Sequence, residues 1–358
     1  GPGQNTHGMM PNFLDGQYNE LRFDQRGLGC SSPENFDLYK DATLYSTENT
    51  IRDMDLIRQS YGISQWSVYG ISYGTVASTM YASKFSNAVR SLVLEGVVGR
   101  TDQIHDVDYK ASKLNQAISN LNSQQRQSLD KLLHEHSEHS SVFIDFIYGY
   151  FYRDIGMREV SNNILPKVFS PAGIINRDAL KRLKKYYDNR DNEYSYAQQP
   201  GMTDTNILSI IYCKNLNEGH SIDKSLAFNT TTGFYSYTSY NQNNREECDS
   251  IGVKEANEMP YEISQNPVSA PVFYFQGSHD GATLAVGAIA HWQTVPQNES
   301  YFMLAQKGGH NPNLTRLNSE KSDIMLYETQ LFKMAIAGSM ITDNNLISIN
   351  NAQDQSQK

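Results

Sequence analysis

Cysteine is scarce in this chain: Cys30, Cys213 and Cys248 are the only three among 358 residues. Three cysteines are too few for a disulfide scaffold, and their separations do not match the spacing of a structural zinc site. Cys213 and Cys248 could pair and leave Cys30 free, or all three could be free thiols. Cysteine content alone therefore leaves the cellular compartment open.

Long apolar runs and an excess of basic residues are also missing. No stretch approaches the roughly 18 apolar residues that a membrane-spanning helix needs, so we expect no membrane insertion. Lys and Arg number 30 against 39 Asp and Glu, and this net charge of -9 argues against nucleic acid as a partner. Residues 1–4 show neither the basic region nor the apolar stretch of a signal peptide, a pattern that a mature secreted protein shares. The chain is nevertheless long enough to bury a full core.

Strand and helix patterns alternate through the first hundred residues and again after about residue 260. Runs rich in β-branched and aromatic residues predict strands at 21–24, 66–69, 91–94, 271–275 and 301–304. Helical spacing of apolar residues predicts helices at 47–61, 72–85 and about 319–337. This alternation is typical of an α/β protein with a mostly parallel sheet flanked by helices.

Between about residues 100 and 259 the pattern changes to polar helical segments. Helices are predicted at 111–134 and 177–187, and a Tyr-rich polar stretch at 229–244 is typical of a loop. We interpret this region as a mainly helical lid, inserted between two parts of a catalytic core.

The predicted organisation thus has four parts. The first part of the core spans 1–99, the lid 100–259, the second part of the core 260–342 and a polar tail 343–358. A helical insertion between sheet strands would cover the edge where the catalytic loops emerge.

The motif Gly70-Ile71-Ser72-Tyr73-Gly74 lies after a predicted strand and at the start of a predicted helix. This context is typical of the nucleophile elbow of the α/β-hydrolase fold, whose tight turn would clash with bulky side chains at the two glycine positions. The helix that follows directs its N–H groups and positive end at charge that develops near Ser72. We therefore predict Ser72 as a nucleophile and the backbone N–H of Tyr73 as an oxyanion donor.

A serine hydroxyl needs a base to remove its proton, and the base needs a partner that fixes its tautomer. In this fold the acid and then the histidine follow the serine along the chain, each on a loop after a later strand. Asp280 follows the strand predicted at 271–275, and His310 follows the strand predicted at 301–304, directly after two glycines. We predict Asp280 as the orienting acid and His310 as the base.

Other residues compete for these two roles. His279 directly precedes the acid, and His291 is embedded in a predicted helix. Asp249 and Asp323 are rival acids, but no predicted strand precedes either of them. The histidines in the lid are expected to be solvated: His134, His136 and His139. None of these displaces the predicted acid and base.

The segment FDQRGLGCSSP at 23–33 resembles the D-Q-R-G-x-G-x-S-x-P segment of proline iminopeptidases and their tripeptidyl-aminopeptidase relatives. Further similarity lies at 69–75, at 91–97 and at the Gly309-His310 turn. Residues 1–3 resemble the end of the H-G-G-P-G oxyanion loop of that family. The resemblance covers both ends of the predicted core, about half of the chain.

This resemblance implies a serine aminopeptidase that acts on peptides with a free N-terminus and needs neither a metal ion nor an organic cofactor. It also implies Gly1 as a second oxyanion donor, and since the chain begins inside that loop, we expect the working enzyme to include upstream strands. The chain departs from the family pattern at Cys30, where a small or hydroxyl residue is usual, and at Leu284, where a proline often follows the acid loop.

Four acidic residues are candidates for contact with the substrate's ammonium group. Glu218, Glu246 and Glu247 lie in the predicted lid, where each also fits an ordinary surface charge. Glu95 ends a strand at the catalytic edge, and packing or exposure to solvent are equal alternatives for its side chain.

Two structural contacts are also expected. Asp24 and Arg26 should form a buried ion pair that braces the loop beneath the site. The resemblance to the tripeptidyl-aminopeptidase branch implies a disulfide between Cys213 and Cys248, which would suit a secreted or periplasmic protein. A cytoplasmic location fits the composition nearly as well.

The predicted function is that of an aminopeptidase that releases N-terminal residues through an acyl-enzyme on Ser72. A carboxylesterase or lipase-like hydrolase is the first alternative, because fold and triad do not set the substrate. A non-catalytic binding protein on the same scaffold is the second. The sequence does not indicate the preferred N-terminal residue, the number of residues removed or the oligomeric state.

Overall fold

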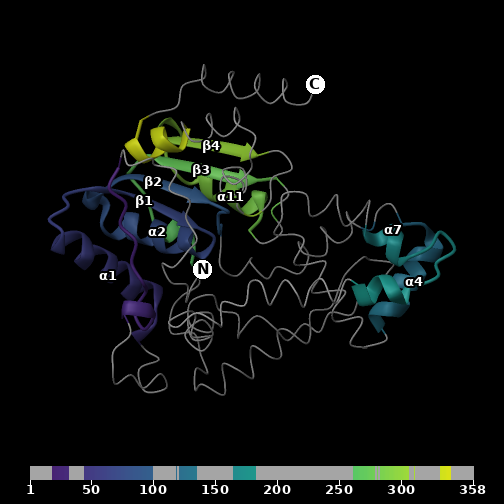
Figure 1. Cartoon of the computed structure of the whole chain (residues 1–358). Coiled ribbons are helices and arrows are strands. Elements are labelled where there is room, and N and C mark those ends of the chain that lie inside the picture. The colour runs from purple at the N-terminus through teal and green to yellow at the C-terminus, as the bar shows by residue number, and fades with distance from the viewer. Residues whose placement is uncertain are drawn as a thin grey trace.

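The computed structural model describes residues 18–31, 44–99, 118, 121–134, 164–182, 261–278, 280, 283–305, 310 and 331–339. Its centre is a sheet of four parallel strands: β1 (Trp66–Ile71), β2 (Val89–Glu95), β3 (Val272–Gly277) and β4 (Ser300–Ala305), in the order β1-β2-β3-β4 (Figure 1). Each of these strands matches a predicted one, so the prediction of a parallel α/β sheet is confirmed.

Helices cover both faces of the sheet because successive side chains of a strand point to opposite faces. On one face Leu92 and Leu94 of β2 join the cluster of buried residues that also contains Val76 and Tyr81 of α2 (Tyr73–Lys84). On the other face Val93 packs in a second cluster with Phe332, which lies in the helical residues 331–337. Strand β2 is therefore buried on both sides, which explains the uninterrupted apolar run at 92–94.

Helix α1 (Thr47–Ser60) packs beside α2 and begins where the sequence provides a cap. The hydroxyl of Ser46 accepts a hydrogen bond from the Asn49 N–H at 3.0 Å. A polar contact then joins the two helices, since the Tyr81 hydroxyl donates to Oδ1 of the buried Asp55 at 3.0 Å. Asp55 also receives hydrogen bonds from Arg58 at 2.8 Å and from Gln59 at 2.6 Å.

The register of the strands brings their carboxyl ends to a common edge. Ile71 pairs with Glu95, Glu95 with Phe275, and Gly277 with Ala305. The segments that follow the four strands therefore emerge side by side. In an open parallel sheet this is the edge at which ligands bind.

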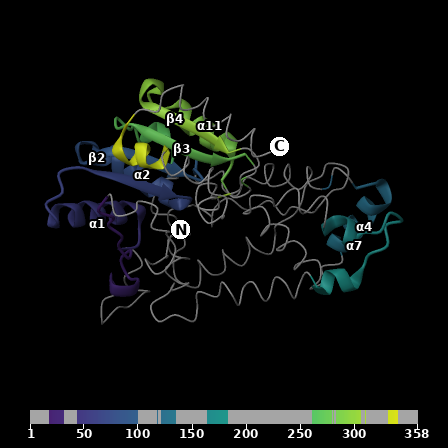
Figure 2. The same ribbon diagram turned by 45° about the horizontal axis from the view of Figure 1, so that its top comes forward.

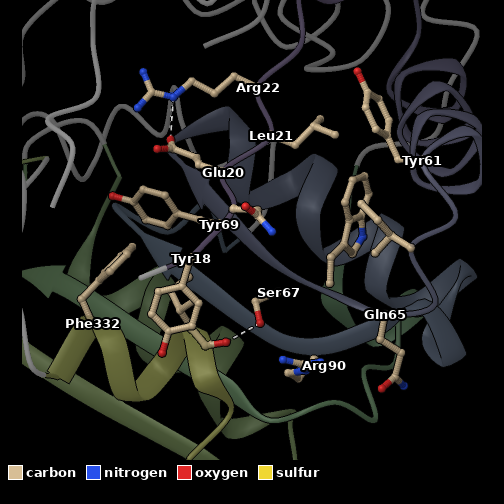
Figure 3. Close-up of a pocket in the computed structure, with 14 residues that line it drawn as sticks. Tyr18, Glu20, Leu21, Arg22, Tyr61, Gln65, Ser67, Tyr69, Arg90 and Phe332 are labelled. Carbon is tan, nitrogen blue, oxygen red and sulfur yellow. Dashed lines mark hydrogen bonds and ion pairs between the residues drawn. The ribbon is translucent and has the colours of Figure 1, made fainter. Parts of the chain in front are cut away.

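The strand predicted at 21–24 is not found, because these residues are not assigned to the sheet in the described part of the chain. Instead residues 18–22 lie across a cavity of about 860 Å³ from β1, which Tyr69, Trp66 and Phe332 also line (Figure 3). The Ser67 hydroxyl donates to the carbonyl of Ile336 in the same region, which ties residues 331–337 to β1.

The predicted ion pair between Asp24 and Arg26 is also wrong. Arg26 makes a bidentate ion pair with Asp53 of α1, with Nε–Oδ2 at 2.8 Å and Nη2–Oδ1 at 2.7 Å. The Asp24 carboxylate accepts the Cys30 N–H at 3.1 Å. The backbone of the turn thus donates a hydrogen bond to Asp24. The planar guanidinium of Arg26 instead pairs with the Asp53 carboxylate, whose geometry matches it, on α1.

Two further helices fall in the predicted lid: α4 (Ser123–His134) and α7 (Leu165–Val168). They lie together, apart from the sheet, in both views (Figures 1 and 2), and the Gln125 side chain donates to the Phe169 carbonyl at 3.0 Å. Residues 177–182 are also helical. Apart from 118, 121–134 and 164–182, the region 100–259 lies outside the described residues, so the boundaries of the lid stay a prediction.

Candidate active site

Ser72 occupies the turn between β1 and α2, at the carboxyl edge of the sheet. Its backbone has φ 56° and ψ -126°, and within the described ranges it is the one non-glycine residue with a positive φ. Such a conformation costs about 1–3 kcal/mol and persists only where the surroundings hold it. Here the Ser72 N–H donates to the Glu95 carbonyl at 3.0 Å, and its carbonyl accepts the Thr75 N–H at 2.8 Å and the Thr75 hydroxyl at 2.6 Å.

The two glycines of the motif have different roles. A Cβ on Gly70 would lie 2.3 Å from the Gly74 carbonyl oxygen and 2.5 Å from Oγ of Ser78, so the predicted clash is confirmed there. A Cβ on Gly74 would meet no heavy atom within 4 Å in the part of the chain that the structure describes. At the second glycine the described residues therefore give no clash, and the expected one stays a prediction.

Asp280 and His310 meet at the same edge, beyond β3 and β4. Nδ1 of His310 lies 3.1 Å from Oδ1 and 3.0 Å from Oδ2 of Asp280, and both side chains are buried, at 7% and 0% exposure. Thr283 donates to the carboxylate through its N–H at 2.9 Å and its hydroxyl at 2.8 Å, and Nε2 of Gln276 donates at 3.0 Å.

These contacts decide the charge of Asp280. Burial by itself raises the pKa of the carboxyl, but the neighbouring His310 and the hydrogen bonds from His310 and Thr283 outweigh it and hold the pKa below its usual value. The group is therefore an anion at neutral pH, which can fix the tautomer of the imidazole and stabilise its protonated form.

Gly96 connects Ser72 with His310. It directly follows Glu95, whose carbonyl binds the Ser72 N–H, and a Cβ on Gly96 would lie 3.1 Å from both Nδ1 and Cε1 of His310. Ser72 is thus bound to Glu95, and the ring of His310 lies against the next residue, Gly96. Although both residues are described, no hydrogen bond joins Ser72 to His310; such contacts are often long before a substrate binds.

The rival histidine His291 is a core residue. It is 1% exposed in α11 (Ala285–Gln293), with Nε2 at 2.8 Å from the Tyr261 hydroxyl and Nδ1 at 2.9 Å from the Tyr274 hydroxyl. Burial lowers its pKa to about 3, so it stays neutral in the core. His134 ends α4. The other rivals lie outside the described residues: His136, His139, Asp249, His279 and Asp323.

Two other predicted site residues are described. Glu95 is fully buried, and the Tyr69 hydroxyl donates to its Oε2, which favours the packing alternative over contact with substrate. Tyr73 begins α2, so its backbone N–H belongs to the amino end of that helix, while its hydroxyl lies 2.8 Å from Oγ1 of Thr47. The remaining predicted residues lie outside the described part: Gly1, Cys213, Glu218, Glu246, Glu247 and Cys248.

Sequence reasoning missed Gln276, Thr283 and Thr75, although each contacts the predicted machinery. A weak signal existed for Gln276, an amide at the end of the otherwise apolar strand VFYFQG, where every residue is buried. Thr283 stands three residues after the acid, which is the spacing of a local turn that satisfies a carboxylate. Cys30, the unusual residue of the 23–33 segment, is an exposed free cysteine.

The described residues contain no group of three or more His, Cys, Asp or Glu side chains arranged to hold a metal ion. Among the same residues no helix combines the length and apolarity required to cross a bilayer.

Comparison with known proteins gives partial matches to aminopeptidases. The proline iminopeptidase of Xylella fastidiosa (strain 9a5c) is 33% identical over 98 residues, which are 27% of this chain and 30% of that protein. The proline iminopeptidase of Neisseria gonorrhoeae is 36% identical over 74 residues, 21% of this chain and 22% of that protein. The matches thus span less than a third of these relatives' length.

The family comparison extends much further along the chain. The structure of an alpha/beta fold family hydrolase from Bacillus anthracis str. Sterne aligns over 88% of this chain and 79% of that hydrolase, with a TM-score of 0.38 and 15% sequence identity. The sequence pattern of the alpha/beta hydrolase fold, in contrast, matches residues 2–317. The chain belongs to the α/β-hydrolase family.

Proposed function

We propose that this protein is a serine hydrolase in which Ser72 is the nucleophile, His310 the base and Asp280 the acid that orients the base. The observation that carries the proposal is the backbone of Ser72, which adopts φ 56° at the junction of β1 and α2. This strained turn lifts a serine side chain to the edge of the sheet, where the buried Asp280–His310 pair also lies.

The tautomer of His310 follows from its contacts. Because Nδ1 faces the Asp280 carboxylate, it carries the proton, and Nε2 is left as the basic nitrogen. In the proposed acylation step, Oγ of Ser72 bonds to the substrate carbonyl carbon, its proton passes to Nε2, and the carbonyl electron pair moves onto oxygen. Collapse of this intermediate breaks the bond to the leaving amine, which takes the proton from His310. Water then cleaves the ester by the same route and restores Ser72.

The developing oxyanion needs hydrogen-bond donors. The Tyr73 N–H, at the amino end of α2, is the first proposed donor, where the helix dipole also favours negative charge. Gly1 is the second proposed donor, carried over from the family's oxyanion loop. Removal of one such donor typically costs on the order of 100- to 1000-fold in rate.

As to substrate, we propose release of N-terminal residues from peptides with a free amino group. The partial matches to proline iminopeptidases support this class over the esterase alternative. Glu218, Glu246 and Glu247 are the proposed partners of the substrate ammonium group.

The test compares three substrates that carry the same acyl residue: an aminoacyl arylamide, its N-acetylated form and the corresponding arylester. We expect the free-amine arylamide to be cleaved and the acetylated form to be spared, with Ser72→Ala inactive on all three. Preference for the ester without regard to the amine would establish the esterase alternative. Lack of turnover on every substrate, together with no labelling by a fluorophosphonate, would favour the non-catalytic alternative.

A further inference from the structure

The residues that follow β2 connect the nucleophile with the acid–base pair. Three successive backbone N–H groups, of Gly96, Val97 and Val98, are engaged by two elements, the first two by β3 and the third by α2. Gly96 donates to the Phe275 carbonyl at 3.1 Å, Val97 to Oε1 of Gln276 at 2.9 Å, and Val98 to Oγ1 of Thr75 at 3.0 Å. We call residues 96–98 the connecting loop.

Each of the two side chains that bind the connecting loop also binds a predicted catalytic residue. The Thr75 hydroxyl donates to the Ser72 carbonyl at 2.6 Å while it accepts the Val98 N–H. Nε2 of Gln276 donates to Oδ2 of Asp280 at 3.0 Å and to the Thr283 carbonyl at 2.8 Å while its oxygen accepts the Val97 N–H. Both side chains are buried, at 1% exposure for Thr75 and 0% for Gln276.

We propose that Thr75 and Gln276 are positioning residues, which fix Ser72 relative to the Asp280–His310 pair by holding the connecting loop through its Val98 and Val97 N–H groups. The inference rests on the proposed function. It explains how Ser72, Asp280 and His310, which follow three different strands, are held in alignment. Since Ser72 and His310 share no hydrogen bond of their own, this loop sets their separation, and Gly96 within it contacts the His310 ring.

The expected effect is a loss of rate without a loss of substrate binding. A displacement of about 1 Å between reacting groups can cost roughly 100-fold in rate. We therefore expect Thr75→Val and Gln276→Met each to lower kcat about ten- to a hundred-fold, with KM within about two-fold of wild type. Thr75→Ser keeps the hydroxyl and should retain most of the wild-type kcat.

Thr79→Val is the matched control. Thr79 is a fully buried threonine one turn further along α2, and its hydroxyl donates to the Thr75 carbonyl at 2.7 Å, as the Thr75 hydroxyl does to Ser72. It does not hydrogen-bond to the connecting loop. Loss of the Thr79 hydroxyl should lower the stability of the fold about as much as loss of the Thr75 hydroxyl does. The kcat per active site should stay near the wild-type value.

The experiment measures kcat per active site, with the active fraction titrated by a fluorophosphonate, and the hydrogen exchange of the Val97 and Val98 amides. We expect faster exchange of Val98 in Thr75→Val and of Val97 in Gln276→Met. The combined loss of kcat in the double variant should be smaller than the product of the single losses, because both act through one loop. Equal losses in Thr75→Val and Thr79→Val, or unchanged exchange of both amides, would overturn the inference.

A different result would contradict the proposed function. A wild-type protein that neither turns over substrate nor reacts with the fluorophosphonate contradicts the serine hydrolase proposal. The exchange of the two amides still tests in that case whether Thr75 and Gln276 hold the connecting loop, since it does not depend on activity.

Discussion

Gly96 and His310 are in such close contact that the glycine has no room for a side chain. A Cβ at Gly96 would lie 2.5 Å from the His310 carbonyl oxygen and 3.1 Å from two ring atoms. The residue also has φ 57°, a conformation that other residues rarely adopt. The residue that directly follows β2 thus packs against the proposed base.

The first prediction follows from this contact. Gly96→Ala should lower kcat/KM at least about ten-fold, because the added methyl group would displace His310 from its position beside Gly96. Gly62→Ala is the control, since Gly62 has φ 66° but a Cβ there would meet no heavy atom of the described residues within 4 Å. Steady-state kinetics and thermal unfolding of both variants separate the two effects. Equal activity losses in the two variants would mean that backbone strain, and not the contact with His310, is responsible.

The second prediction concerns the stability of the helix pair α1–α2 at low pH. Burial raises the pKa of Asp55, but the hydrogen bonds from Arg58, Gln59 and Tyr81 outweigh it and lower the pKa below its usual value of 3.8. Because the folded-state pKa is depressed, Asp55 stabilises the fold above the unfolded-state pKa, and this contribution is lost as the pH falls through the folded-state pKa.

Asp55→Asn should therefore lower the free energy of unfolding by about 2 kcal/mol at pH 7. The difference from wild type should shrink as the pH falls below about 4. Urea unfolding at a series of pH values measures this, with the exposed Asp178→Asn as the control. A difference that does not change with pH would contradict the assigned charge of Asp55.

The third prediction concerns the base. As the proposed base, His310 takes the Ser72 proton on Nε2, so a side chain without a basic nitrogen cannot replace it. His310→Gln should abolish turnover at every pH, whereas His279→Gln should keep the wild-type profile. The reverse result would assign the base to His279.

The fourth prediction concerns selectivity. Charge-assisted hydrogen bonds to the substrate ammonium group are worth about 1.5–3 kcal/mol, or roughly ten- to a hundred-fold in rate. Of the variants Glu218→Gln, Glu246→Gln and Glu247→Gln, at least one should lose that much activity on free-amine arylamides. If all three keep the wild-type ratio of free to N-acetylated substrate, these residues are surface charges.

The sequence predicted the sheet well because each strand carries its own local signal. Short apolar runs between turn residues stand at 66–69, 91–94, 271–275 and 301–304, and each of them overlaps an observed strand. The segment 21–24 alternates apolar and charged residues, as a half-buried strand does, but has no place in the described sheet. Its composition could not show this, because strand pairing depends on distant residues.

The site was predictable only where chemistry dictates a motif. Ser72, Asp280 and His310 stand at turns after strands, so their placement at one edge follows from topology. The partners of Gln276 and Arg26 depend instead on how separate elements pack. Arg26 therefore reaches Asp53 on α1 instead of its near neighbour Asp24, and the residues between them in sequence give no sign of it.

The central claim is that Ser72 is an activated nucleophile. The most direct measurement is reaction of the wild-type protein with a fluorophosphonate, followed by peptide mapping by mass spectrometry. We predict a single adduct on Ser72 in the wild type, no adduct in Ser72→Ala, and at least a thousand-fold loss of turnover in that variant, on the order found for other triads. An adduct on another residue, or turnover in Ser72→Ala close to wild type, would contradict the account.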